Sequence, residues 1–418
     1  MCKPLSRGLL LSLPLSLLIL MMMCAPLPPV GAQTPAGQPP AREPFGASLN
    51  RTRPQPARTD GAEAKQRPGE DGLPPPEETL KVETLLVSLD VVVTDRAGSR
   101  FITGLGKDDF IVVEDERPQE ISTLTLGDDA ARLPRSIVLI LDWSGSQAPY
   151  LAESVRAAKT LVDQLTPTDQ MAIVTDDVKL AIDFTGDKKR LKSTLDSFMK
   201  LTGKGWHGKS RQFSALLATL RELIDVEQRR PIIIFQTDGD EAERLKDPPR
   251  GGSNAPGVYY MSDINAEVEK SRVKIYTVIP SPRLAGASQS DILRVGQQIM
   301  ARVQEHYIKT HRPEIPAGGR PPIPDNVVAM VMAAAARQQA AAAHVAELSG
   351  GWTAFLETPE RAAEIYARIL EDINHRYIIG YYPTNKERDG KPRRVRIEVR
   401  GHPEYTVHGR QSYYATQR

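Results

Sequence analysis

Between about residues 131 and 373, short apolar runs alternate with segments in which apolar residues recur every three or four positions. Ser136 to Leu141 is a continuous apolar run, typical of a strand covered on both faces of a sheet. Tyr150 to Leu165 has helical periodicity. Further strands are predicted at Met171–Thr175, Leu180–Phe184, Ile232–Phe235 and Val273–Ile279, and further helices at Lys188–Met199, Ser214–Val226, Asp291–Tyr307, Val327–Leu348 and Pro359–Ile373. This alternation predicts an α/β fold with a doubly wound, mostly parallel sheet.

Both flanks of this central region are rich in β-branched and aromatic residues separated by turn residues. The predicted strands are Val82–Thr94, Phe110–Val113 and Glu120–Leu126 before it, and Tyr377–Tyr382, Val395–Val399 and Tyr405–Tyr414 after it. Three short strands alone make a marginal core. We therefore predict that an N-terminal β segment (residues 80–130) and a C-terminal β segment (374–418) pair into one accessory β-sandwich, with the central domain (131–373) inserted between them.

The first 32 residues have the features of an export signal. Positive charge at Lys3 and Arg7 precedes an apolar run from Leu9 to Met23, and small residues follow up to Ala32. The apolar run is short for a membrane span, and Pro14 interrupts it. We expect cleavage near Ala32 and a secreted, periplasmic or cell-envelope protein with no membrane span in the mature chain; a retained signal anchor is the alternative.

Residues 33–79 are rich in Pro, Ala, Gly and Arg and contain no Ile, Val, Tyr or Trp. Such a segment cannot bury enough apolar surface to offset the entropy lost on ordering. We predict that it is a disordered linker.

Composition excludes a disulfide-stabilised protein and a nucleic-acid-binding protein, and it disfavours a lipoprotein. Both cysteines, Cys2 and Cys24, lie in the predicted leader, so disulfides cannot stabilise the mature chain. Lipidation at Cys24 is disfavoured because Met23, rather than a small residue, precedes it. The formal net charge of +2 offers no basic surface for nucleic acid, which we exclude as a partner.

Candidate chemistry follows two of the apolar strands. Asp142, Ser144 and Ser146 come directly after the first central strand, where ligands bind in open α/β sheets. A later strand, Pro231–Phe235, leads to Asp238 in the same way. Carboxylate and hydroxyl oxygens are hard ligands, suited to Mg²⁺ and also to Mn²⁺ or Ca²⁺. The alternative is a polar turn in which Ser144 or Ser146 caps the next helix.

These turns resemble a known family. The pattern DxSxS after one strand, with TDG after a later one, is similar to the metal-ion-dependent adhesion site of von Willebrand factor type A (VWFA) domains. The flanks resemble bacterial secreted VWFA-related proteins, those with the VWFA-related acidobacterial domain, at Val91–Asp95, Gly104-Leu105, Asp109-Phe110, Val113–Asp115, Leu348–Gly351 and Arg376–Pro383. The resemblance extends from about Val82 to Tyr414.

The resemblance implies a ligand set and a mode of binding. Asp142, Ser144, Ser146 and Asp238 match the first and last loops of the family's site. The middle loop in such domains has a threonine just before a helix; Ser214 stands in that region here, with Ser210 as a fallback ligand. The bound cation is under-neutralised by protein charges, so an Asp or Glu carboxylate of a protein partner takes an open position. This implies an adhesion-type, metal-dependent binding module.

An enzyme is the competing class, and the sequence disfavours it. The chain has no GxSxG, HExxH or GxxxxGK[ST] motif, and Ser144 stands where an aspartyl phosphatase has its second acid. His207 and His344 have no partner motif. The second functional hypothesis is a structural or scaffold protein of the envelope with a vestigial metal site. Segments Glu241–Ser262 and Ser281–Asn326 are expected near the metal site, where they set specificity, although the helix in the second could equally serve packing.

Overall fold

The computed structural model describes residues 44–51, 86–98, 100–125, 134–201, 210–224, 229–248, 253, 255–311 and 323–415. The predicted export signal, the remainder of the predicted linker and His207 lie outside the described residues. No helix in these described ranges is both long and apolar enough to cross a membrane.

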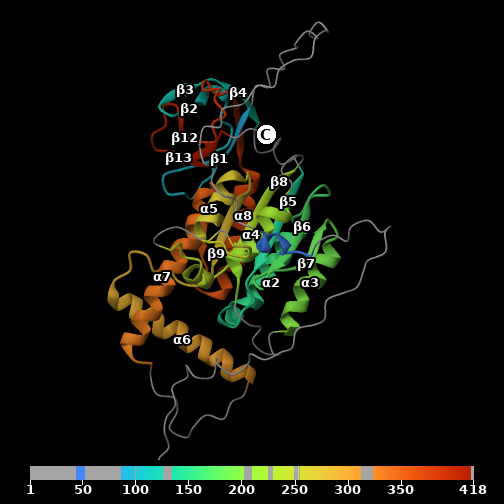
Figure 1. The fold of residues 1–418 in the computed structure, drawn as a ribbon, viewed down its shortest axis with the longest axis vertical. Coiled ribbons are helices and arrows are strands. Elements are labelled where there is room, and N and C mark those ends of the chain that lie inside the picture. The colour runs from blue at the N-terminus through green and yellow to red at the C-terminus, as the bar shows by residue number, and fades with distance from the viewer. Residues whose placement is uncertain are drawn as a thin grey trace, which may run out of the picture. The chain divides into compact units, whose positions relative to one another are not determined.

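A six-stranded sheet forms the centre of the fold, with strand order β10-β9-β8-β5-β6-β7 (Figure 1). The strands are β5 (Arg135–Leu141), β6 (Gln170–Thr175), β7 (Lys179–Thr185), β8 (Arg230–Gln236), β9 (Lys274–Ile279) and β10 (Thr353–Phe355). All neighbours pair in parallel except β6 and β7. The doubly wound, mostly parallel sheet predicted from the sequence is therefore confirmed.

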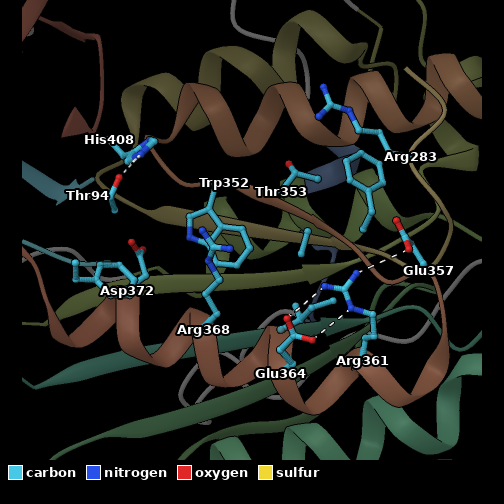
Figure 2. Close-up of a pocket in the computed structure, with 14 residues that line it drawn as sticks. Thr94, Arg283, Trp352, Thr353, Glu357, Arg361, Glu364, Arg368, Asp372 and His408 are labelled. Carbon is cyan, nitrogen blue, oxygen red and sulfur yellow. Dashed lines mark hydrogen bonds and ion pairs between the residues drawn. The ribbon is translucent and has the colours of Figure 1, made fainter. Parts of the chain in front are cut away.

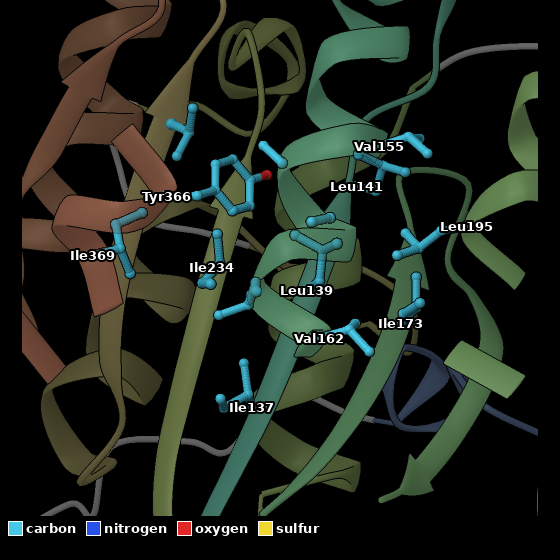
Figure 3. Packing of buried hydrophobic residues seen from close by; sticks show 14 of the residues in the cluster. Ile137, Leu139, Leu141, Val155, Val162, Ile173, Leu195, Ile234, Tyr366 and Ile369 are labelled. Carbon is cyan, nitrogen blue, oxygen red and sulfur yellow. The ribbon is translucent and has the colours of Figure 1, made fainter. Parts of the chain in front are cut away.

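Helices cover both faces of this sheet, so its strands are buried on both sides. Packed on one face are α2 (Ala148–Asp163), α3 (Lys188–Leu201) and α8 (Ala362–Asn374), and on the other α4 (Gln212–Glu222), α5 (Met261–Lys270) and α7 (Asp325–Leu348). Figure 3 shows how Leu139 and Leu141 of β5 meet Val155 of α2 in the first layer. Val138 and Ile140 point to the second layer. This two-sided burial explains why β5 is an unbroken apolar run.

Two four-stranded antiparallel sheets form the accessory part, in the orders β13-β1-β11-β4 and β14-β12-β2-β3. Their strands are β1 (Val87–Thr94), β2 (Phe110–Glu114), β3 (Arg117–Gln119), β4 (Ile121–Thr125), β11 (Tyr377–Tyr381), β12 (Pro392–Val399), β13 (Thr406–His408) and β14 (Ser412–Tyr414). Each sheet contains strands from both ends of the chain, as predicted, and the two share one apolar core that includes Val91, Phe110 and Ile379. The single strand predicted at Tyr405–Tyr414 is instead two strands, one in each sheet.

Part of the predicted disordered linker is ordered, which corrects the prediction for residues 44–51. A short 3-10 helix, η2 (Ala47–Asn50), lies against α4. The backbone N–H groups of Gly46 and Ser48 donate to the Glu222 carboxylate, both at 2.8 Å, and Leu49 is buried. The composition argument failed here because Leu49 and the partly buried Phe45 supply an apolar contact that the average over the segment hides.

A partly buried ionic cluster, with buried Arg376 and Lys274 around a half-buried Asp90, connects β1 to the central sheet. Arg376 donates to Asp90 Oδ1 at 3.0 Å, Arg230 donates to Asp90 Oδ2 at 3.2 Å, and Lys274 Nζ donates to the Asp90 carbonyl at 3.2 Å. Burial alone would raise the pKa of the Asp90 carboxyl, but these cations hold it well below its usual range. Burial, reinforced by the Arg376 charge, lowers the pKa of Lys274 from 10.5 to about 7.

The Lys274 pKa predicts a pH dependence of stability. Between pH 7 and 10.5 the unfolded chain binds a proton at Lys274 that the folded chain does not, so the free energy of unfolding should rise with pH in this window. Below pH 7 both states are protonated and the cost of burying the charge is fully present. We expect Lys274→Met to flatten this rise by on the order of a few kcal/mol, measured by urea unfolding from pH 6 to 10. A rise as steep in the variant as in the wild type would contradict the assignment.

Truncation of the central strand should be costly. Leu139 is completely buried, and Leu139→Ala removes packing that the surrounding layers cannot replace, so we expect a loss of about 2 to 5 kcal/mol in urea unfolding. Met330→Ala, at a side chain that is 68% exposed, is the matched control and should change stability by less than about 0.5 kcal/mol.

Candidate functional site

The parallel pairing of β5 with β8 brings two aspartates together. Leu141 lies opposite Gln236, so the turns that follow both strands leave the sheet at the same edge, called the carboxyl edge below. There the side-chain amide of Gln212 donates to Asp142 Oδ2 and to Asp238 Oδ1, at 2.9 Å each. The two carboxylate oxygens are therefore separated by at most twice that distance.

Two serines complete this group. The Ser144 N–H donates to Asp142 Oδ1 at 3.0 Å, and the Ser144 and Ser146 hydroxyls are 3.1 Å apart. The Ser146 hydroxyl donates to Asp238 Oδ2 at 2.6 Å. The structure thus brings together four of the residues that the sequence singled out. Asp142 and Ser144 are buried, whereas Ser146 is exposed, so the group opens to solvent on its Ser146 side.

Ser214 does not join this group. Its N–H donates to Glu241 at 2.9 Å, its hydroxyl also bonds the Glu241 carboxylate, and it lies 2.5 Å from the Tyr259 hydroxyl. The reason is helical geometry: α4 begins at Gln212, and a residue two positions later is rotated by about 200° around the helix axis. Gln212, not Ser214, therefore faces the two aspartates.

Ser210, the fallback ligand, bonds a third acid that the sequence analysis missed. Its hydroxyl donates to Asp176 Oδ2 at 2.7 Å, and the backbone N–H of Trp143 donates to Asp176 Oδ1 at 3.3 Å. Asp176 follows β6 directly, as Asp142 follows β5 and Asp238 follows β8. An acid after a buried apolar strand was the signal in all three cases, and it was available in the sequence for Asp176 too.

The electrostatics of the carboxyl edge favour an added positive charge. Burial raises the pKa of Asp142 well above its usual range, and the charges of Asp238 and Asp176 raise it further. The contacts that act in the opposite direction, from Ser144 and Gln212, are neutral hydrogen bonds. Burial and the Asp238 charge also raise the pKa of Asp240. The negative charge here is stabilised by hydrogen bonds without being neutralised.

The donor set fits a divalent cation bound by oxygen. Gln147 is almost completely buried beside the group, and its amide donates to Asp238 Oδ2 at 2.9 Å. Within the described residues its Oε1 has no hydrogen-bond partner, an uncompensated acceptor where a cation would be favourable. Within the described ranges, no group of three or more His, Cys, Asp or Glu side chains is arranged to hold a metal ion, so hydroxyl and amide oxygens would have to complete a site built on Asp142 and Asp238.

The sequence predicts that Glu241–Ser262 and Ser281–Asn326 lie near this edge and set specificity, and the structure describes parts of both. After Asp238, Gly239 has φ +77°, and a Cβ there would lie 2.6 Å from the Gln338 carbonyl of α7, so the turn needs glycine to pass the helix. The turn continues into η5 (Asp240–Arg244), where Glu243 bonds Arg337 of α7 at 3.0 Å. In the second segment, α6 (Gln289–His311) packs its apolar side on α7. This contact agrees with the alternative that the helix serves packing.

A cavity of about 390 Å³ lies apart from these acids, lined by residues of β10 and α8 together with Thr94 and His408 (Figure 2). Its charges are largely paired within the protein: Arg361 bonds Glu364 at 3.3 Å, and Arg368 stacks over Trp352 at 5.3 Å. None of the aspartates described above lines it. We therefore assign the candidate site to the carboxyl edge.

Comparison with protein-family models gives no match, and comparison with curated proteins gives none either. Among solved structures the chain is similar to the conserved hypothetical protein BatB from Bacteroides thetaiotaomicron, at 14% identity over 57% of this chain and 98% of that one, with a TM-score of 0.32. It is similar to the manganese-loaded TRAP protein from Plasmodium vivax, at 11% identity over 72% and 98% and a TM-score of 0.32. It is also similar to the vWF domain of the type V pili tip protein Mfa5 from Porphyromonas gingivalis, at 14% identity over 58% of this chain and 95% of that one, with a TM-score of 0.31.

The contacts of Ser214 predict a structural effect of its removal. Ser214→Ala leaves the buried Glu241 carboxylate without a hydroxyl donor, so we expect a loss of about 1 to 3 kcal/mol in urea unfolding and no loss of cation binding. Ser262→Ala, at a hydroxyl bonded to Asp247 on the surface, is the control for stability. Loss of cation binding in Ser214→Ala would instead restore this serine as a ligand.

Proposed function

We propose that the chain is a metal-dependent protein-binding module of the adhesion type. Asp142, Ser144, Ser146 and Asp238 hold one divalent cation, Mg²⁺ or alternatively Mn²⁺ or Ca²⁺. The observation that carries the proposal is the meeting of Asp142 and Asp238 at one edge, where neutral hydrogen bonds alone offset their repulsion. A cation would provide the missing charge, and carboxylates with hydroxyls are ligands that Mg²⁺ accepts.

The exposure of the site suggests how a partner is bound. The buried Asp142 and Ser144 form its floor, and the exposed Ser146 lies at its mouth. A cation there would keep a coordination position on the solvent side, and an Asp or Glu carboxylate of a protein partner would gain a charge-assisted bond by filling it. The proposed partner is therefore a protein, and the proposed location is outside the cytoplasm, in keeping with the N-terminal signal pattern.

The site serines lack the partner that catalysis needs. Ser144 bonds Ser146, and Ser146 bonds Asp238 and Gln147, so within the described part of the chain no histidine contacts either hydroxyl. A serine nucleophile requires an adjacent base to activate it. We propose no enzymatic activity for this site.

One observation favours a second function, a scaffold protein of the envelope whose metal site is vestigial. The Gln212 amide donates to both carboxylates, and the Ser214 hydroxyl bonds Glu241. In that case the accessory sheets or the surface helices make the contacts, and the carboxyl edge is only structural.

Titration calorimetry with Mg²⁺ and Mn²⁺ on the protein without its leader separates the two functions. Under the binding function the wild type gives a saturable heat that Asp142→Ala abolishes, because the variant loses the buried carboxylate. Asp196→Ala, at an exposed aspartate paired with Lys159, is the matched control and should bind normally. Absence of heat from the wild type favours the scaffold function.

The partner is sought by capture from envelope fractions with and without EDTA. A protein retained by the wild type and the Asp196→Ala control, but lost with EDTA or in Asp142→Ala, supports carboxylate binding at the cation. Retention that ignores both EDTA and the Asp142→Ala change contradicts it.

A further inference from the structure

Gln212 occupies an unusual position at the carboxyl edge. It is the first residue of α4, its side chain is completely buried, and its Nε2 lies 2.9 Å from an oxygen of Asp142 and 2.9 Å from an oxygen of Asp238. A primary amide nitrogen carries two hydrogens, so it can donate to both carboxylates at once. A cation held by these two oxygens would compete with the amide for them, whereas Asp142 Oδ1 and Asp238 Oδ2 bond Ser144 and Ser146.

The amide is fixed from behind by a short chain of buried groups. Its Oε1 faces the Glu241 N–H at 3.4 Å, and the Glu241 carboxylate in turn accepts from the N–H and the hydroxyl of Ser214. Glu241 is buried, and its position therefore depends on these donors. The Gln212 side chain is oriented with its nitrogen toward the acids and its oxygen away from them.

The Gln212 amide satisfies the hydrogen bonding of Asp142 and Asp238 but does not neutralise their charge. The amide provides two donors to oxygens that would otherwise repel each other, but it carries no charge, so the repulsion between Asp142 and Asp238 remains. The unpartnered Oε1 of the buried Gln147, beside Asp238, is a further acceptor that no donor in the described residues satisfies. The Gln212 amide thus satisfies hydrogen bonds of both carboxylates, whereas a cation would also neutralise their charge.

We propose that Gln212 is a built-in competitor of the cation: its amide bridges Asp142 and Asp238 in the metal-free protein and must withdraw before a cation can be shared by them. This inference rests on the proposed function and adds a control to it. The bridge offsets the repulsion between the two acids and lowers cation affinity, so binding occurs only where the cation is concentrated or a partner carboxylate adds its own bond.

Two substitutions test the bridge. Gln212→Thr is too short to span both acids but supplies a hydroxyl oxygen, and its Mg²⁺ dissociation constant should be about tenfold to a hundredfold lower than that of the wild type, the factor that corresponds to losing one charge-assisted hydrogen bond on cation entry. In EDTA, Gln212→Ala should unfold a few degrees below the wild type. Gln297→Ala, at an amide that donates to Asp325 outside the site, is the matched control and should change neither quantity.

The outcomes separate the bridge from the function. Equal Mg²⁺ affinity in the wild type and Gln212→Thr overturns the bridge and leaves the metal-dependent function standing. Absence of Mg²⁺ binding by both overturns the function and, with it, the competition by Gln212. Tighter binding by Gln212→Thr, together with a lower unfolding temperature of Gln212→Ala than of Gln297→Ala, supports both.

Discussion

The parallel register of β5 with β8 is the constraint on which the candidate site depends. Because Leu141 lies opposite Gln236, both strands end together and each delivers an aspartate to one edge. The helices on both faces hold that register: a slip by one residue would turn each β5 side chain toward the opposite core and disrupt the packing of both layers. Two carboxylates that repel each other are thus held close together by packing elsewhere in the domain.

Much of the fold could be predicted because its signals are local and strong. The continuous apolar run of β5 predicts a doubly covered strand, and the need of short flanking strands for partners predicts their pairing across the inserted domain. Three elements escaped prediction: β3 and β10, which have three residues each, and α5, which lies at the end of a segment rich in turn residues. The two strands are too short to be recognised without their neighbours, and α5 has only ten residues.

The site was predictable only in part. Asp142, Ser144, Ser146 and Asp238 stand in the short turns that follow two strands, so the sheet brings them to one edge. Ser214 and Gln212 are on a helix, and which of them faces the acids depends on the residue at which α4 begins. Helix starts are among the least certain features of a sequence, since a shift of one residue turns a side chain by about 100°. A glutamine was also not considered because an amide is an uncommon member of such a site.

The pairing of β4 with β11 has a consequence for the whole chain. Thr125, the last residue of β4, lies opposite Ile378 of β11, so the points at which the polypeptide enters and leaves the central domain are fastened side by side. This pairing closes a very long loop and reduces the freedom that the domain would gain on unfolding, as a disulfide does. The two cysteines of the chain stand at positions 2 and 24. Backbone hydrogen bonds between β4 and β11 therefore provide the restraint that a disulfide bond provides in other proteins.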